Sequence, residues 1–291
     1  MTEILIIGAS GLLGQHLLNE AEARHCSVTG TYFSEEVAGL VRLDIQDADA
    51  VDTIIKRTHP DIVMLSAAMT SIGECEKNRS QAQSVNAEAP LEVAKTCRRV
   101  GAKMVLFSTA NVFDGKSESA DENLPPNPVS TFGKTRLQGE LNVLGALPDS
   151  LVIRTCMNFG WNRLRSRENE VTRLIHEIRC GKRVELSTAR WTTPSYAPDV
   201  AKHLFDLLRM EESGIYHVAT KSRLTEYEMG MRVCEAFGLD KGKLLDATTG
   251  EAKMEDLNPR RLCLSTTKVE KKLDTPMNSV ERCLAEMSIN H

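Results

Sequence analysis

Three glycines near the start of the chain have the spacing of a phosphate-binding loop. Gly8, Gly11 and Gly14 follow a short β-branched run and lie at the opening of a segment with helical spacing, Leu12–Ala23. Glycine allows a tight turn and a close approach to the backbone, while a helix that begins there offers free N–H groups and the positive end of its dipole. The pattern predicts a site for the diphosphate of a dinucleotide. The alternative is a tight strand–helix turn that binds nothing.

Residues expected to contact the dinucleotide lie in this loop and at the ends of the next strands. The loop supplies Gly8, Ser10, Gly11, Leu12, Leu13 and Gly14, and the strand ends supply Tyr32, Asp44, Ile45, Ser66, Ala67 and Ala68. On spacing alone, Asp44 could equally be a capping or surface residue. The small residues at 66–68 could equally serve packing between sheet and helix.

The choice between NAD and NADP stays open at this stage. An acid that clasps the ribose hydroxyls is expected ~20 residues after the glycines, whereas Glu35 and Glu36 come slightly later. No arginine stands beside them to accept a 2′-phosphate. The predicted cofactor is therefore NAD or NADP.

The elements that must position these residues alternate along the first half of the chain. Helical spacing occurs at Leu12–Ala23, Ala48–Thr58, Ala82–Val100 and Phe132–Leu144, and strand-like runs occur at Ile4–Gly8, Ser27–Tyr32, Asp61–Ser66, Met104–Ser108 and Leu151–Thr155. Such alternation is typical of βαβ units and a parallel sheet. The predicted fold class is α/β, a Rossmann-type doubly wound parallel sheet with a smaller, mainly helical C-terminal lobe.

The pattern loosens after residue 155, which suggests a division of the chain. We expect an NAD(P)-binding Rossmann domain over 1–155 and a smaller substrate-type lobe over 156–291, with a segment at about 190–220 crossing back. Arg163–Glu170 is charged and is predicted to be a loop. Further helical patterns occur at Val171–Cys180, Pro198–Met210, Glu226–Phe237 and Val280–Met287.

Composition disfavours several classes of partner. A net charge of −4 and a pI of about 6.0 argue against nucleic acid and anionic membranes, which need a basic surface. No apolar run approaches the ~20 residues of a membrane span, and the first residues lack the basic region of a signal peptide. The eight cysteines form no C-x-x-C pair, so no metal site is predicted. We expect a cytoplasmic protein with reduced thiols.

Further motifs carry a resemblance to a known family. They are Asn86, Ser108-Thr109, Val112-Phe113-Asp114-Gly115, Gly133-Lys134-Thr135-Arg136-Leu137-Gln138-Gly139-Glu140, Arg154-Thr155, Thr193-Pro194-Ser195-Tyr196 and Pro259-Arg260. With the glycine loop, they resemble extended short-chain dehydrogenases of the dTDP-4-dehydrorhamnose reductase type. The same branch includes the regulatory β subunit of methionine adenosyltransferase, to which the chain is also similar.

The resemblance implies a particular chemistry for three positions. In that family NAD(P)H reduces a nucleotide-linked 4-keto sugar, and the residue at the Thr109 position orients the carbonyl. A Tyr-x-x-x-Lys pair supplies the proton, and its two positions are Phe132 and Arg136 here. Homodimers also occur across the family, so the resemblance allows one here by analogy.

The pair at 132 and 136 departs from the family pattern. Hydride addition leaves an alkoxide that needs a proton donor, and Phe132 has no hydroxyl to donate. Arg136 keeps the positive charge and could still bind ribose hydroxyls, but it cannot relay a proton. Asn111 and Met157 replace aromatic residues expected in the family. We therefore expect reductase activity that is weak or lost.

Three hypotheses follow for the function. The chain could reduce a sugar nucleotide with a relocated acid, for which Tyr196 is one candidate by its place in the sequence. It could be a non-catalytic dinucleotide-binding subunit that regulates a partner enzyme. It could also catalyse another reaction on the same scaffold, such as epimerisation or dehydration, although those enzymes normally use the same tyrosine.

Overall fold

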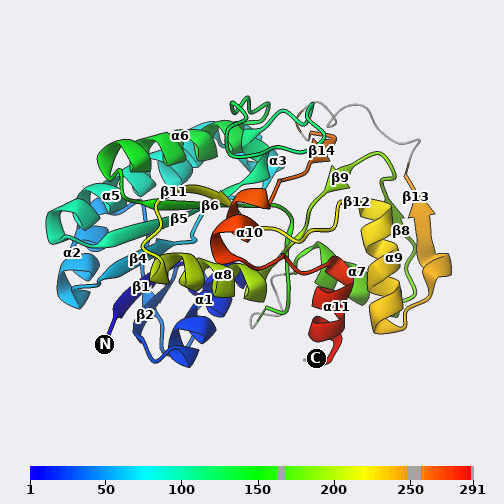
Figure 1. The fold of residues 1–291 in the computed structure, drawn as a ribbon, viewed down its shortest axis with the longest axis horizontal. Helices are drawn as coiled ribbons and strands as arrows, with labels where there is room; N and C mark the ends of the chain where they lie inside the picture. The colour runs from blue at the N-terminus through cyan, green and yellow to red at the C-terminus, as the bar shows by residue number, and fades with distance from the viewer. Residues whose placement is uncertain (163–167, 248–256, 258, 290–291) are drawn as a thin grey trace.

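A parallel sheet forms the centre of the molecule in the computed structural model, which describes residues 1–162, 168–247, 257 and 259–289 (Figure 1). The predicted loop at Arg163–Glu170 therefore lies largely outside the described residues. Among those residues the sheet has seven strands in the order β11-β6-β5-β4-β1-β2-β3. The strands are β1 (Glu3–Ile7), β2 (Ser27–Tyr32), β3 (Val41–Arg42), β4 (Ile62–Leu65), β5 (Lys103–Thr109), β6 (Leu151–Thr155) and β11 (Gly214–His217).

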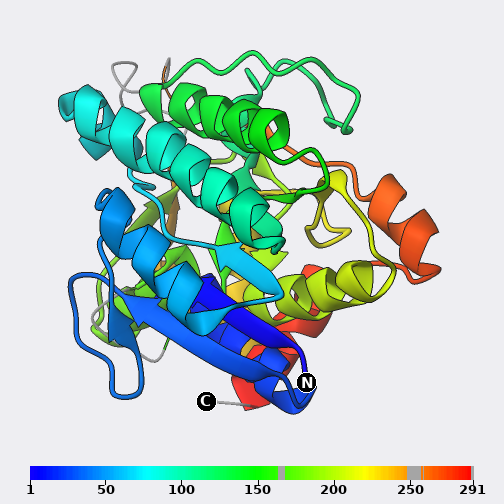
Figure 2. The same ribbon diagram turned by 90° about the vertical axis from the view of Figure 1, so that its left-hand side faces the viewer.

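Helices cover both faces of this sheet (Figure 2). One face carries α2 (Ala48–Thr58), α5 (Ala89–Val100) and α6 (Thr131–Ala146), and the other carries α1 (Leu12–Ala23) and α8 (Ala197–Arg209). Alternate residues of β1 enter the two cores, with Ile4 and Ile6 on the α1 side and Leu5 and Ile7 on the α2 side. Burial on both faces explains why the strands read as continuous apolar runs.

The long helix predicted over Ala82–Val100 is wrong in detail. The structure has α4 (Arg79–Gln83), a π-helical turn η1 (Ser84–Glu88) and then α5. Pro90 has no N–H to bond to the carbonyl of Asn86, which interrupts regular α-helical bonding at this point. That carbonyl instead faces α6, where a side chain larger than the hydrogen of Gly139 would overlap it.

A smaller lobe lies beside the sheet and completes the molecule (Figure 1). Its helices α7 (Glu170–Arg179), α9 (Glu226–Phe237) and α11 (Val280–Ile289) share one hydrophobic core. Short strand pairs border them: β7 (Asn158–Phe159) with β10 (Ser195–Tyr196), β8 (Val184–Leu186) with β13 (Leu244–Asp246), and β9 (Trp191–Thr192) with β12 (Leu224–Thr225) and β14 (Arg261–Leu262). The remaining elements are α3 (Ile72–Lys77), α10 (Thr267–Leu273), η2 (Ala110–Val112) and η3 (Lys241–Lys243).

A buried ion pair joins α6 to the sheet. Arg154 on β6 donates from Nη2 to Glu140 Oε2 at 2.6 Å and from Nε to Glu140 Oε1 at 3.0 Å. Ser108 on β5 donates its hydroxyl to the same carboxylate. The Arg154 and Glu140 side chains are only 2% and 1% exposed, so this link is shielded from water and salt. It ties the helix to two neighbouring strands.

Substituting Glu140 by Gln should cause a large loss of stability. The change leaves the Arg154 guanidinium buried without its counter-charge, which typically costs ~3–5 kcal/mol. The free energy of unfolding in urea measures the effect. Glu92→Gln is the matched control, because Glu92 pairs with Lys95 at the surface and exposed pairs contribute under ~1 kcal/mol. Equal losses in the two variants would contradict the assignment.

His217 adds a pH dependence to this network. It accepts from Arg154 Nη1 at 3.4 Å, and its Nδ1–H donates to the Ala120 carbonyl at 3.2 Å. Burial, together with the Arg154 charge, lowers the pKa of His217 from 6.5 to about 3. Between these values the unfolded chain takes up a proton that the folded chain does not. The free energy of unfolding should therefore fall as the pH falls from 6.5 toward 3.

The His217 contribution should approach a slope of ~1.4 kcal/mol per pH unit within that range. His217→Gln keeps a donor and an acceptor but does not titrate, so it should remove this part of the slope. Urea unfolding at several pH values between 4 and 7 measures it. The same substitution at exposed His25 controls for losing a histidine, and an unchanged slope in His217→Gln would contradict the prediction.

Candidate functional site

A large cleft opens along the carboxyl ends of the strands, at the point where the strand order reverses between β1 and β4. Ligands of doubly wound folds bind at this reversal. The cleft measures about 1210 Å³ and extends from the glycine loop into the smaller lobe. The structure brings all the predicted site residues together along its lining: Gly8, Ser10, Gly11, Leu12, Leu13, Gly14, Tyr32, Asp44, Ile45, Ser66, Ala67, Ala68, Thr109, Phe132 and Arg136.

The glycine loop forms a cradle of bare backbone. Gly8 has a φ of +92°, and a Cβ there would lie 2.7 Å from the amide nitrogen of Ala67. A Cβ on Gly14 would overlap the Gly8 carbonyl, so helix α1 can pack this close only with glycine. Gly11 precedes the helix and offers no side-chain cap. The first N–H groups of α1 therefore stay available for an anionic group.

The opposite end of this half of the cleft follows β2 and β3. Tyr32 and Ile45 line it, and the Asp44 carboxylate accepts the N–H of Gln46 at 3.0 Å. Asp44 is thus a turn residue that also lines the cleft, and its contact with a dinucleotide stays a prediction. The sequence reasoning missed Phe33, which lines the cleft with 53% of its surface exposed. The feature of the sequence that could have indicated Phe33 is its place as an aromatic residue directly after the second predicted strand.

Thr109 ends β5 and faces the middle of the cleft. Its Oγ1 accepts from the backbone N–H of Asn111 at 3.2 Å and from Asn111 Nδ2 at 3.1 Å. Helix α6 begins nearby because the Ser130 hydroxyl caps the N–H of Gly133. A side chain at Gly133 would overlap the Asn111 carbonyl. The start of α6 is therefore pressed against the segment that follows Thr109.

Phe132 lies in this first turn of α6, at 6% exposure. Its ring packs with Cys75 and Ala82, and with the partly buried Met69 and Ile72, while it also lines the cleft. The ring has no polar atom, so it adds an apolar surface where the related enzymes are expected to present a phenol.

Arg136 lies one helical turn further along α6 and is 5% exposed. Its Nη1 has no hydrogen-bond partner among the described residues. Burial lowers the pKa of Arg136 to about 10, against the opposing effects of Glu140 and Cys75. The guanidinium therefore stays protonated at neutral pH. Its nearest acid, Glu140, is already engaged by Arg154 and Ser108.

Neither of two candidate side chains, Tyr196 and Cys156, provides a relocated proton donor beside Thr109. Tyr196 packs on Phe159 with ring centroids 5.2 Å apart, is 4% exposed and does not line the cleft. Burial also raises the pKa of its phenol. The lining thiol of Cys156 has its pKa raised by burial to about 12, which makes it an unreactive neutral group.

Two asparagines near Thr109 were missed as site residues by the sequence reasoning. Asn158 donates its Nδ2 to Thr155 Oγ1 at 3.0 Å, as Asn111 does to Thr109. Both line the cleft, and both leave a shielded Oδ1 without a partner in the described structure. Met157 between the strands adopts a left-handed φ of +40°. The only signal in the sequence was the departure of Asn111 and the neighbouring Met157 from the family motifs, and nothing in the sequence pointed to Asn158.

The described residues contain no group of three or more His, Cys, Asp or Glu placed to hold a metal ion. In the same residues, no helix has both the length and the apolar character needed to cross a membrane.

Comparison with known proteins identifies the family. The model of the RmlD substrate binding domain matches residues 1–290. The chain belongs to the RmlD substrate binding domain family. The prediction of a dTDP-4-dehydrorhamnose reductase-like protein is thereby confirmed at the level of the family.

Individual members of the RmlD family match nearly the whole chain. The probable low-salt glycan biosynthesis reductase Agl14 of Haloferax volcanii is 30% identical, covering 97% of this chain and 96% of that protein. Methionine adenosyltransferase 2 subunit beta of Danio rerio is 27% identical, covering 92% and 84%. The crystal structure of dTDP-4-dehydrorhamnose reductase from Bacillus anthracis, in complex with NADP, has a TM-score of 0.89 at 23% identity, covering 100% and 99%. The predicted fold class is confirmed.

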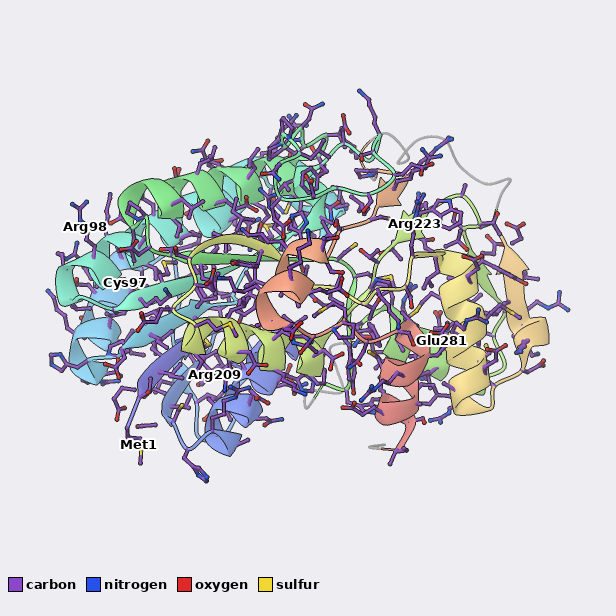
Figure 3. All side chains as sticks on the ribbon, in the orientation of Figure 1. Met1, Cys97, Arg98, Arg209, Arg223 and Glu281 are labelled. Carbon is purple, nitrogen blue, oxygen red and sulfur yellow. The ribbon has the colours of Figure 1, made fainter. Side chains whose placement is uncertain are left out.

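Arg136→Met should stabilise the protein in the absence of ligands. The change replaces a buried, unpaired guanidinium by an apolar chain of similar length, and removing a poorly compensated buried charge is worth ~1–4 kcal/mol. Urea unfolding measures the difference from wild type. Arg98→Met on the exposed side of α5, next to buried Cys97 (Figure 3), is the control and should change stability by under ~0.5 kcal/mol. Destabilisation by Arg136→Met would mean that the guanidinium has a partner.

Proposed function

We propose that this chain is an NAD(P)-binding, reductase-like protein whose ability to reduce a ketone is weak or lost. One observation carries the proposal: the cleft keeps the glycine cradle and Thr109, while the position at which the family motif has its tyrosine holds Phe132. The glycine loop that would bind the dinucleotide is retained, and the tyrosine hydroxyl that would donate the proton is absent.

The residues of the cleft fit a dinucleotide. The bare backbone at Gly8, Gly11 and Gly14 and the free N–H groups of α1 suit the diphosphate. Ala67 approaches so closely that little but backbone lines that wall. The guanidinium of Arg136, whose Nη1 has no partner among the described residues, suits ribose hydroxyls. The relative from Bacillus anthracis, which has the same fold, was solved with NADP, and this supports a cofactor of the NAD or NADP class.

The chemistry that these residues permit stops short of a complete reduction. A bound reduced nicotinamide would supply a hydride. The Thr109 hydroxyl accepts both of its hydrogen bonds from Asn111, so its own hydrogen remains free to orient a carbonyl. Phe132 donates no proton, and Arg136 holds its protons at neutral pH because its pKa is about 10. The alkoxide left by hydride transfer would have to draw a proton from water.

The substrate half of the cleft supports a nucleotide-linked sugar as the ligand. Helices α7 and α9 of the smaller lobe line it, and Arg173, Arg190 and Trp191 offer two cations and an aromatic surface. Such groups bind phosphate and stack on planar rings. The relative named as a glycan biosynthesis reductase agrees with this ligand class.

The purified protein should bind NADH or NADPH, seen as a blue shift of nicotinamide fluorescence, at concentrations up to ~1 mM. It should oxidise NADH slowly with a dTDP-4-keto sugar, because loss of a general acid costs ~10²–10⁴-fold. The double variant Phe132→Tyr, Arg136→Lys should regain activity within that range. Phe132→Leu with Arg136→Lys is the matched control, which restores lysine but no phenol and should regain none.

Two results would contradict the proposal. Absence of binding by both dinucleotides would show that the glycine cradle is only a structural turn. Rapid turnover by the wild-type protein, unchanged by a Thr109→Val substitution, would show that a different group donates the proton.

A second candidate function is regulation of a partner enzyme. The specific support is the similarity, over 92% of the chain, to a protein named as a subunit of methionine adenosyltransferase. A dinucleotide-binding subunit needs no proton donor, which agrees with Phe132. Affinity purification from the native cell should then yield an enzyme whose kinetics change on addition of this chain. Unchanged kinetics of every co-purified enzyme would count against this function.

A further inference from the structure

Among the buried charged side chains in the wall of the cleft behind Phe132, the cations outnumber the anions by one. These side chains are Arg136, Arg154 and Glu140, two guanidinium cations and a single carboxylate. Glu140 is bound by Arg154 through both oxygens and accepts the hydroxyl of Ser108. The adjoining His217 is uncharged at neutral pH, because its pKa is lowered to about 3.

The surplus charge resides on Arg136. Its side chain is 5% exposed, lines the cleft and has an unpartnered Nη1. A tyrosine at position 132 could ionise and share this charge, but a phenyl ring cannot. The ribose hydroxyls of a bound dinucleotide are neutral. They can accept hydrogen bonds from the guanidinium, yet they leave its charge uncompensated, which is unfavourable in a buried place.

The donors beside this charge suit a carboxylate. The guanidinium presents a planar fork that matches two carboxylate oxygens, and the Thr109 hydroxyl keeps its hydrogen for a ligand. A carboxylate carries one negative charge, which equals the surplus. A phosphate carries about −1.5 to −2 and would reverse the sign of the charge in the wall.

We propose that this corner of the cleft binds a carboxylate group of the ligand. The ligand class is then a nucleotide-linked sugar acid, in place of a neutral keto sugar. This assignment rests on the proposed function, because it places the sugar beside a bound dinucleotide. It also gives Phe132 and Arg136 a joint role, since the same pair of residues removes the proton donor and leaves the charge that recognises the acid.

Matched sugar nucleotides test the assignment on protein saturated with NADH. UDP-glucuronate and UDP-glucose differ only by a carboxylate in place of a hydroxymethyl group, and the dTDP-linked pair repeats the comparison with another base. Isothermal titration calorimetry should give an affinity about tenfold higher, or more, for the glucuronate of at least one pair. Arg136→Met should bring the ratio of affinities close to one. Arg136→Lys, which keeps the charge without the fork, should retain part of the preference.

The ratio of affinities separates recognition of the acid from general effects on binding. Arg173→Met changes another arginine that lines the cleft, and it should alter both affinities together and leave their ratio unchanged. Equal affinities in the wild type, no binding of either sugar, or a ratio that survives Arg136→Met would each overturn the assignment. In those cases bound NADH still supports the proposed function, whereas failure of NADH to bind overturns both.

Discussion

The ion pair between Arg154 and Glu140 is the interaction on which the site depends. It connects the middle of α6 to β6, and Ser108 extends the connection to β5. The Thr109 hydroxyl directly follows Ser108, and Arg136 lies one turn before Glu140 on the same helix. A shift of α6 by one residue would break the bidentate contact and leave two buried charges unpaired, which is strongly unfavourable. The relative positions of Thr109, Phe132 and Arg136 are therefore fixed by electrostatics in the core.

Two glycines make this arrangement sterically possible. Gly133 allows α6 to contact the segment after Thr109. Gly139 allows α6 to contact the carbonyl of Asn86, which lies in the π-helical turn η1. Asn86 in that turn also holds the Met69 backbone through both its amide atoms, at 2.9 Å each. The register of α6 is thus determined by the Arg154–Glu140 ion pair and by the close contacts at Gly133 and Gly139. This register places Phe132 in the lining of the cleft, at the position where the family resemblance predicts a tyrosine.

Most helices and strands of the Rossmann-type fold can be predicted from the sequence, because the patterns that indicate them extend over only a few neighbouring residues. Helices such as Leu12–Ala23 and Ala48–Thr58 match the predicted bounds, since apolar spacing and capping residues such as Asp47 are read over a few positions. The strand pairs of the smaller lobe were not predicted. They are two or three residues long and pair segments as distant as Trp191 and Arg261, so no periodicity reveals them.

The charge balance of the cleft is a property that no single motif contains. Taken alone, Arg136 is a conservative replacement of the lysine expected at its position. Taken alone, Phe132 differs from the expected tyrosine only by the missing hydroxyl. Only the packed structure shows that Glu140 is hydrogen-bonded by Arg154 and that, within the described part of the chain, Nη1 of Arg136 has no hydrogen-bond partner. A buried surplus charge persists only where something compensates it or where function retains it. The proposed carboxylate site would supply this compensation, because a bound anion would pair with the guanidinium of Arg136.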